Sequence, residues 1–218
     1  MSIVARTLSD QAYEVIRERI LSAEFLPMSP IRQDALSIEL GVSKVPLREA
    51  LARLGQDGLI GSHPNRGFFV LPLTAVEAHE VFDLRLKVEP DATVDGALAA
   101  DAKDRKAAEE ALKQLEQEAL APGPRGVALN RAFHVALVKP AGKQVTTSLI
   151  DRLHVISERY VRKHLEPPGR DKRAHREHRA LFNAWVKQDA ETVKRLCADH
   201  IQCTLRDLQA QLSAADGK

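Results

Sequence analysis

The chain has 218 residues and a mass of 24.1 kDa, which suits one large domain or two ordinary ones. Its hydrophobic fraction of 44% and charged fraction of 28% are those of an ordinary soluble protein, and no apolar run reaches the length of a membrane span. Only two cysteines occur, Cys197 and Cys203, which excludes a disulfide framework and a zinc ribbon. We therefore expect a cytoplasmic protein without a membrane partner, and the aromatic fraction of 4% favours helices over a β-rich core.

The first predicted element is a helix over residues 8–21. Apolar side chains recur there at helical intervals, and Thr7 or Ser9 can cap its N-terminus. The segment from Phe25 to Pro30 contains Pro27 and Pro30 and is predicted to be a loop.

The stretch from Leu36 to Leu54 predicts a helix-turn-helix. Its apolar residues fall at helical intervals on both sides of Gly41, where a residue without Cβ can take positive φ in the turn. Ser43 suits an N-cap and Pro46 suits a first turn, so the second helix should begin near Lys44.

The exposed side of that second helix carries basic residues. Lys44 and Arg48 lie one turn apart and off the apolar face, so both can point into a DNA major groove, and arginine matches the edge of guanine. An amphipathic helical hairpin with a solvated face is the alternative. Residues 1–71 hold eight Lys/Arg and eight Asp/Glu, so DNA binding must depend on the placement of charge.

Residues 59–71 alternate in polarity and are interrupted by His63-Pro64-Asn65-Arg66-Gly67, which predicts a two-stranded wing. Arg66 at its tip is placed to meet a minor groove or a phosphate, or else is simply solvated.

Beyond Pro72, the sequence pattern predicts helices only. We expect them over residues 74–100, 104–120, 127–138, 143–165, 170–187 and 189–212, separated by Pro- and Gly-containing breaks. The predicted fold is mostly α, with a DNA-binding domain over residues 1–72 and an antiparallel helical bundle over residues 73–218.

Four polar residues of the bundle form a candidate metal site. Asn130 and His134 share one helix face, and His178 and His200 belong to the last two helices, which should be antiparallel neighbours. One oxygen and three imidazoles suit a divalent transition metal, but spacing alone leaves scattered structural histidines as the stronger alternative.

Two resemblances sharpen these expectations. The run GVSKVPLREAL (41–51), Gly58-Leu59-Ile60 and the segment 65–70 resemble the DNA-binding domain of the GntR family of bacterial winged-helix regulators. Family members usually have Arg and Thr where Lys44 and Val45 stand, and glycines where Ala23 and Met28 stand. The resemblance implies that DNA contacts come from Arg32, Ser43, Lys44, Val45, Pro46, Arg48, Asn65, Arg66 and Gly67.

The second half is similar to the FCD ligand-binding domain of the FadR-like branch. The matching segments are 85–89, 130–134, 177–181, 188–189 and His200. The resemblance implies that His134, His178, His200 and Asn130 hold zinc, nickel or manganese, although metal-binding relatives have Asp at the position of Asn130. It also implies a small organic acid effector, for which Arg85 and Arg159 are candidate ligands. A pair between Arg85 and Glu89 is an equally good reading.

We therefore predict a homodimeric transcriptional repressor that binds a palindromic double-stranded DNA operator and is released by its effector. A metal-dependent hydrolase on the helical domain is one alternative, although the sequence contains no HExxH motif. A DNA-architectural protein without an effector is another.

Overall fold

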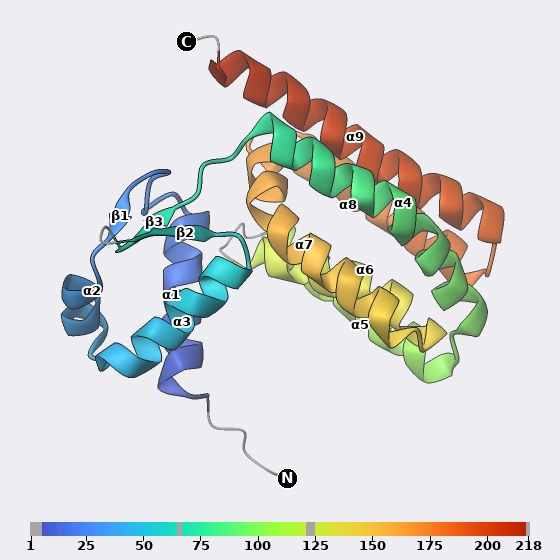
Figure 1. The fold of residues 1–218 in the computed structure, drawn as a ribbon. Coiled ribbons are helices and arrows are strands. Elements are labelled where there is room, and N and C mark those ends of the chain that lie inside the picture. The colour runs from blue at the N-terminus through green and yellow to red at the C-terminus, as the bar shows by residue number, and fades with distance from the viewer. Residues whose placement is uncertain (1–5, 65–66, 121–124, 217–218) are drawn as a thin grey trace. The chain divides into compact units, whose positions relative to one another are not determined.

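A computed structural model describes residues 6–64, 67–120 and 125–216. The chain forms two compact units, Met1–Leu73 and Thr74–Lys218, which are described separately (Figure 1). In the described ranges, no helix combines the length and apolarity needed to cross a bilayer.

The first unit is a winged helix-turn-helix. Its helices are α1 (Leu8–Leu21), α2 (Gln33–Leu40) and α3 (Lys44–Gln56), and its strands are β1 (Pro30–Ile31), β2 (Ile60–His63) and β3 (Gly67–Val70). The strands form one antiparallel sheet in the order β1-β3-β2. The predicted helices and wing are thus confirmed, whereas β1 falls at the end of the segment predicted to be a loop.

Backbone conformation explains how the helices meet. Gly41 ends α2 with φ of 64°, and the Ser37 hydroxyl donates to the carbonyl of Val42 at 2.6 Å, which closes the turn. Ala23 and Met28 also have positive φ, 60° and 64°, a conformation that favours glycine. The loop before β1 therefore keeps its left-handed turns at the steric cost of two side chains.

The second unit contains helices throughout its described residues. They are α4 (Ala75–Ala99), α5 (Ala102–Leu120), α6 (Gly126–Val138), α7 (Gln144–Leu165), α8 (Arg170–Val186) and α9 (Ala190–Asp216), with a 3-10 turn at Lys139–Ala141. α4 and α9 lie side by side and antiparallel (Figure 1). The predicted all-helical bundle is confirmed.

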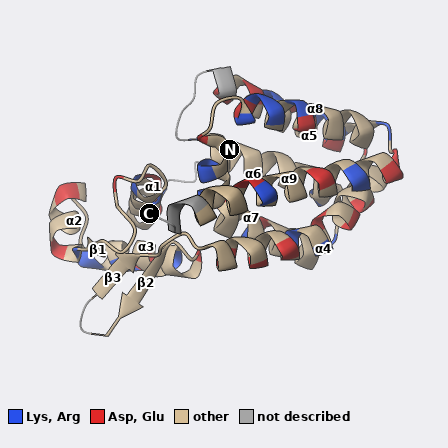
Figure 2. Ribbon diagram, turned by 90° about the horizontal axis from the view of Figure 1, so that it is seen from above, with Lys and Arg blue, Asp and Glu red and all other residues tan. Residues whose placement is uncertain are grey.

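Close packing holds α4 against the end of α6. A Cβ at Gly96 of α4 would lie 1.9 Å from the carbonyl oxygen of Leu137, so only glycine permits this approach. The indole of Trp185 donates to the same oxygen at 3.0 Å. These contacts hold α4, α6 and α8 together around the bundle interior. Lys/Arg and Asp/Glu positions are interspersed along the helices (Figure 2).

Candidate DNA-binding surface and metal centre

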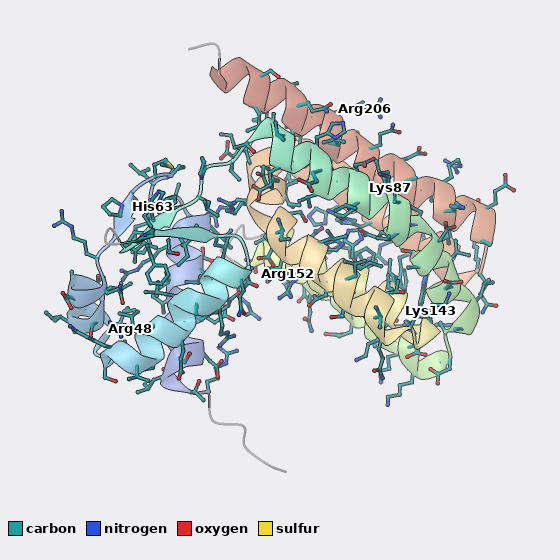
Figure 3. The ribbon with its side chains drawn as sticks, in the orientation of Figure 1. Arg48, His63, Lys87, Lys143, Arg152 and Arg206 are labelled. Atoms are coloured by element: carbon teal, nitrogen blue, oxygen red, sulfur yellow. The ribbon has the colours of Figure 1, made fainter. Side chains whose placement is uncertain are left out.

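The N-terminal turns of α3 present the predicted DNA-binding residues to solvent. Leu47, Ala50, Leu51 and Leu54 are buried, which turns the opposite face outward, with Arg48 on it (Figure 3). The exposed residues of this group are Arg32 at the start of α2, Ser43, Lys44, Val45 and Arg48, and Pro46 is partly exposed.

One acidic residue lies beside this surface. The ammonium group of Lys44 is 2.8 Å from a carboxylate oxygen of Asp34 on α2, and both side chains are largely exposed. The pair lowers the pKa of Asp34 because Lys44 donates to its carboxylate. Lys44 therefore has a partner in the DNA-free protein that a phosphate would have to replace.

The predicted wing contacts are described only in part. Asn65 and Arg66 lie outside the described residues, and Gly67, with φ of 78°, begins β3. On β2, the ring of His63 stacks on Phe69 with centroids 4.7 Å apart. A Cβ at Gly61 would lie 2.6 Å from the Phe69 ring, so this glycine makes room for the stack.

Three histidines from three helices converge inside the second unit. One ring nitrogen from each of His134 (α6), His178 (α8) and His200 (α9) falls in a group whose atoms all lie within 4.8 Å of one another. The Nε2 atoms of His178 and His200 are 3.3 Å apart. Ligands about 2.0–2.1 Å from a tetrahedral zinc ion stand about 3.3–3.4 Å from each other, so this spacing suits shared coordination.

Carboxylates contact the opposite nitrogen of two of these rings. Nδ1 of His134 lies 3.1 Å from Oε1 of Glu89, and Nδ1 of His200 lies 2.7 Å from Oε2 of Glu177. A neutral imidazole that donates from Nδ1 has its lone pair on Nε2. Nε2 of His134 is buried and has no hydrogen-bond partner among the described residues. A metal ligand atom would show the same environment in the absence of its ion.

Burial also favours the uncharged state that metal binding requires. It lowers the pKa of His134 to about 3, against the opposing effect of Glu89. Burial, together with His200 and His134, holds the pKa of His178 well below its ordinary value. Both rings are therefore neutral near pH 7, and the donor set fits a divalent transition metal.

A second group, Glu89, His134 and His154, was missed by the sequence analysis. Nε2 of His154 lies 3.0 Å from Oε1 of Glu89, and Nε of Arg85 lies 2.9 Å from Oε2. Burial alone would raise the pKa of Glu89, but Arg85 and the two histidines hold it well below its usual value. An ionised carboxylate that accepts from a guanidinium and two neutral imidazoles needs no cation. The one sequence signal was His154 recurring with Ile150, Leu153 and Val161 on the buried face of α7.

Three further predicted ligands remain: Asn130, Arg85 and Arg159. Asn130 is buried on α6 one turn before His134, and its role as a ligand stays a prediction. Arg85 makes the predicted pair with Glu89 and is only 3% exposed. Arg159 is also buried, with Nη2 at 3.5 Å from Glu77. The guanidinium of Arg85 is thus already engaged by a carboxylate of its own helix.

Comparison with known proteins identifies a matching family model for each of the two units. The model of the bacterial regulatory proteins of the gntR family matches residues 8–70, and the FCD domain model matches residues 80–202. An uncharacterized HTH-type transcriptional regulator of Bacillus subtilis (strain 168), YdhC, is 30% identical over 87% of this chain and 86% of that protein. The HTH-type transcriptional repressor RspR of Escherichia coli (strain K12) is 25% identical over 89% and 86%.

Solved structures share the fold. McbR/YncC of E. coli superposes with a TM-score of 0.78 at 20% identity, covering 95% of this chain and 99% of that one. A GntR regulator from Rhodococcus sp. RHA1 gives 0.74 at 21% identity, covering 95% and 98%. The chain therefore belongs to the GntR family of transcriptional regulators, with a winged helix-turn-helix followed by an FCD domain.

Proposed function

We propose that this regulator is a repressor, that it binds a palindromic operator as a homodimer, and that a small organic acid releases it. The observation that carries DNA reading is the exposed face of α3, where Lys44, Val45 and Arg48 stand free of the buried leucine seam. The name of the similar protein RspR, a repressor, supports the direction of regulation.

The proposed effector site contains a divalent transition metal held by His134, His178 and His200. Three imidazole ligands leave coordination positions for water or a carboxylate oxygen of the effector. The metal supplies a fixed positive charge, and the histidines hold it between α6, α8 and α9. We propose Asn130 as a weaker fourth ligand, because an amide oxygen attracts a cation less than a carboxylate does.

Release requires that the effector bind one arrangement of the dimer more tightly than the other. Contacts between the bundle helices and the bound effector would favour the arrangement in which the two α3 helices no longer match the operator half-sites. Arg85 and Arg159 are the proposed partners for an effector carboxylate. Both are buried, and each already lies near a carboxylate of the protein, Glu89 and Glu77 respectively.

The test of DNA reading is the Arg48→Ala variant. An operator is first selected from random-sequence DNA with the wild-type protein, and affinities are then compared by fluorescence anisotropy at moderate salt. We expect Arg48→Ala to lose specific binding while Arg206→Ala, which removes the same charge from an exposed position on α9, retains it (Figure 3). Equal affinity of both variants would contradict the proposal.

The test of sensing is a thermal-shift screen of organic acids with and without a chelator. We expect at least one acid to raise the unfolding midpoint only when metal is present, and the same acid to weaken operator binding. An acid that stabilises the chelated protein equally would place the effector elsewhere.

A further inference from the structure

We infer that Glu89 and Glu177 are positioning residues that fix His134 and His200 as Nε2 ligands of the metal. This inference rests on the proposed metal role of the three histidines. It concerns carboxylates that do not touch the cation themselves but set which nitrogen of each ring faces it.

Glu89 is rigidly held from three helices. Arg85, one turn earlier on α4, donates to both of its oxygens, from Nε at 2.9 Å and from Nη2 at 3.3 Å. His154 of α7 and His134 of α6 both reach Oε1. The Glu89 side chain is only 1% exposed, and burial strengthens these contacts because the surroundings have a low dielectric constant. The ring of His134 is therefore fixed with Nε2 turned toward His178 and His200.

Glu177 does the same for His200 from a more open position. It directly precedes His178 on α8, and its Oε2 lies 2.7 Å from Nδ1 of His200 on α9. Its Oε1 lies 3.4 Å from Nε of Arg173, which also pairs with Asp207 of α9. One ligand and the positioning carboxylate of another are thus adjacent residues of α8, so α8 and α9 must keep their register for the site to form.

The same contacts argue against a second cation between Glu89, His134 and His154. A cation there would have to displace the Nδ1 proton of His134 and the Nε2 proton of His154, and it would compete with Arg85 for the carboxylate. It would also stand beside a buried guanidinium. We therefore expect one metal ion per chain.

Physically, a carboxylate acceptor at Nδ1 makes the imidazole more basic and stops it from rotating. Both effects strengthen binding without adding a ligand. They also offset the absence of an anionic side chain among the three histidine ligands.

The experiment measures zinc affinity of the full chain by chelator competition and the visible absorption of the cobalt-substituted protein. We expect Glu177→Ala to weaken zinc binding by roughly 10–100-fold and to change the cobalt spectrum, with Glu177→Gln recovering part of the affinity because it keeps an acceptor. Glu116→Ala is the matched control, since Glu116 is similarly exposed (31% against 29%) and pairs with Arg179 of α8. It should leave affinity and spectrum unchanged.

Glu89→Gln should weaken zinc binding further, but loss of the buried charge also threatens folding, so the Glu177 series carries the test. Unfolding midpoints of the metal-free variants separate loss of positioning from loss of structure. If the wild type binds zinc and Glu177→Ala binds it equally with the same cobalt spectrum, the inference fails alone. If the wild type binds no zinc, the proposed metal role fails and takes the inference with it. Two zinc ions per chain would overturn the assignment of Glu89.

Discussion

Nδ1 of His134 lies 3.1 Å from Oε1 of Glu89, while Nε2 of the same ring is buried without a hydrogen-bond partner among the described residues. One nitrogen thus contacts a protein carboxylate, and the other has no protein partner among the described residues. Because Glu89 also holds Arg85 and His154, this pair joins the histidine group to helices α4 and α7. The buried polar centre of the bundle is one connected network.

The free energy of unfolding of the metal-free helical unit should decrease as the pH is lowered. The folded pKa values of His134, His154 and His178 are lowered by burial, whereas unfolded histidines titrate near 6.5. The unfolded chain therefore binds more protons below that pH, so stability is complete above about pH 6.5 and decreases as pH falls toward the folded values. Urea unfolding with a chelator, followed by fluorescence of Trp185, should show a loss of more than ~1 kcal/mol per pH unit.

Two variants test whether buried histidine rings cause this loss of stability at low pH. His178→Gln should make the pH dependence shallower, and His79→Gln, at an exposed position of α4, should leave it as in the wild type. A free energy of unfolding that stays constant between pH 7 and pH 5 would rule out neutral buried histidines.

Removing Asp34 should strengthen operator binding. Its carboxylate pairs with Lys44 at 2.8 Å, and an exposed pair of this kind is worth about 0–1 kcal/mol, so Asp34→Asn should tighten binding by up to about fivefold. Glu39→Gln is the control, because it removes the same charge from the same helix but from a pair with Arg19. Anisotropy titrations at several salt concentrations would measure both. An equal gain in the two variants would indicate bulk charge and not release of Lys44.

Ala23→Gly should stabilise the winged unit. Ala23 is exposed and has φ of 60°, a strain that glycine relieves, and the gain after the entropy cost of glycine is about 0.5–1 kcal/mol. Ala52→Gly, at an exposed position inside α3, should instead cost about 1 kcal/mol. Hydrogen exchange of buried α3 amides reports this unit alone. Slower exchange in Ala23→Gly and faster exchange in Ala52→Gly is the expected pair of results, and faster exchange in both would show that the turn carries no strain.

Local patterns predicted the helices, the turn at Gly41 and the wing because each is set by residues close in sequence. They missed β1, because a strand of two residues exists only through its pairing with β3, far along the chain. They also missed the contacts of Glu89 with His134 and His154. Periodicity identifies a buried helix face, but it does not say which side chain of another helix meets it.

The positive φ values at Ala23 and Met28 show a related limit. The sequence has alanine and methionine where family members usually have glycine, yet the backbone keeps the left-handed turns. At Met28 a tertiary contact holds the turn, since its amide donates to the carbonyl of Val70 on β3 at 2.8 Å, whereas at Ala23 the hydrogen bond is local, from its amide to the carbonyl of Ile20 at 3.2 Å.

We propose above all that His134, His178 and His200 hold a metal ion, and that the effector binds at this ion when it releases the winged helix from DNA. Elemental analysis of the purified wild type and of His178→Ala tests it most directly. We predict close to one zinc, nickel or manganese ion per wild-type chain and none in His178→Ala. A wild-type protein without stoichiometric metal, after loading with each of these ions and removal of the excess, would contradict the account.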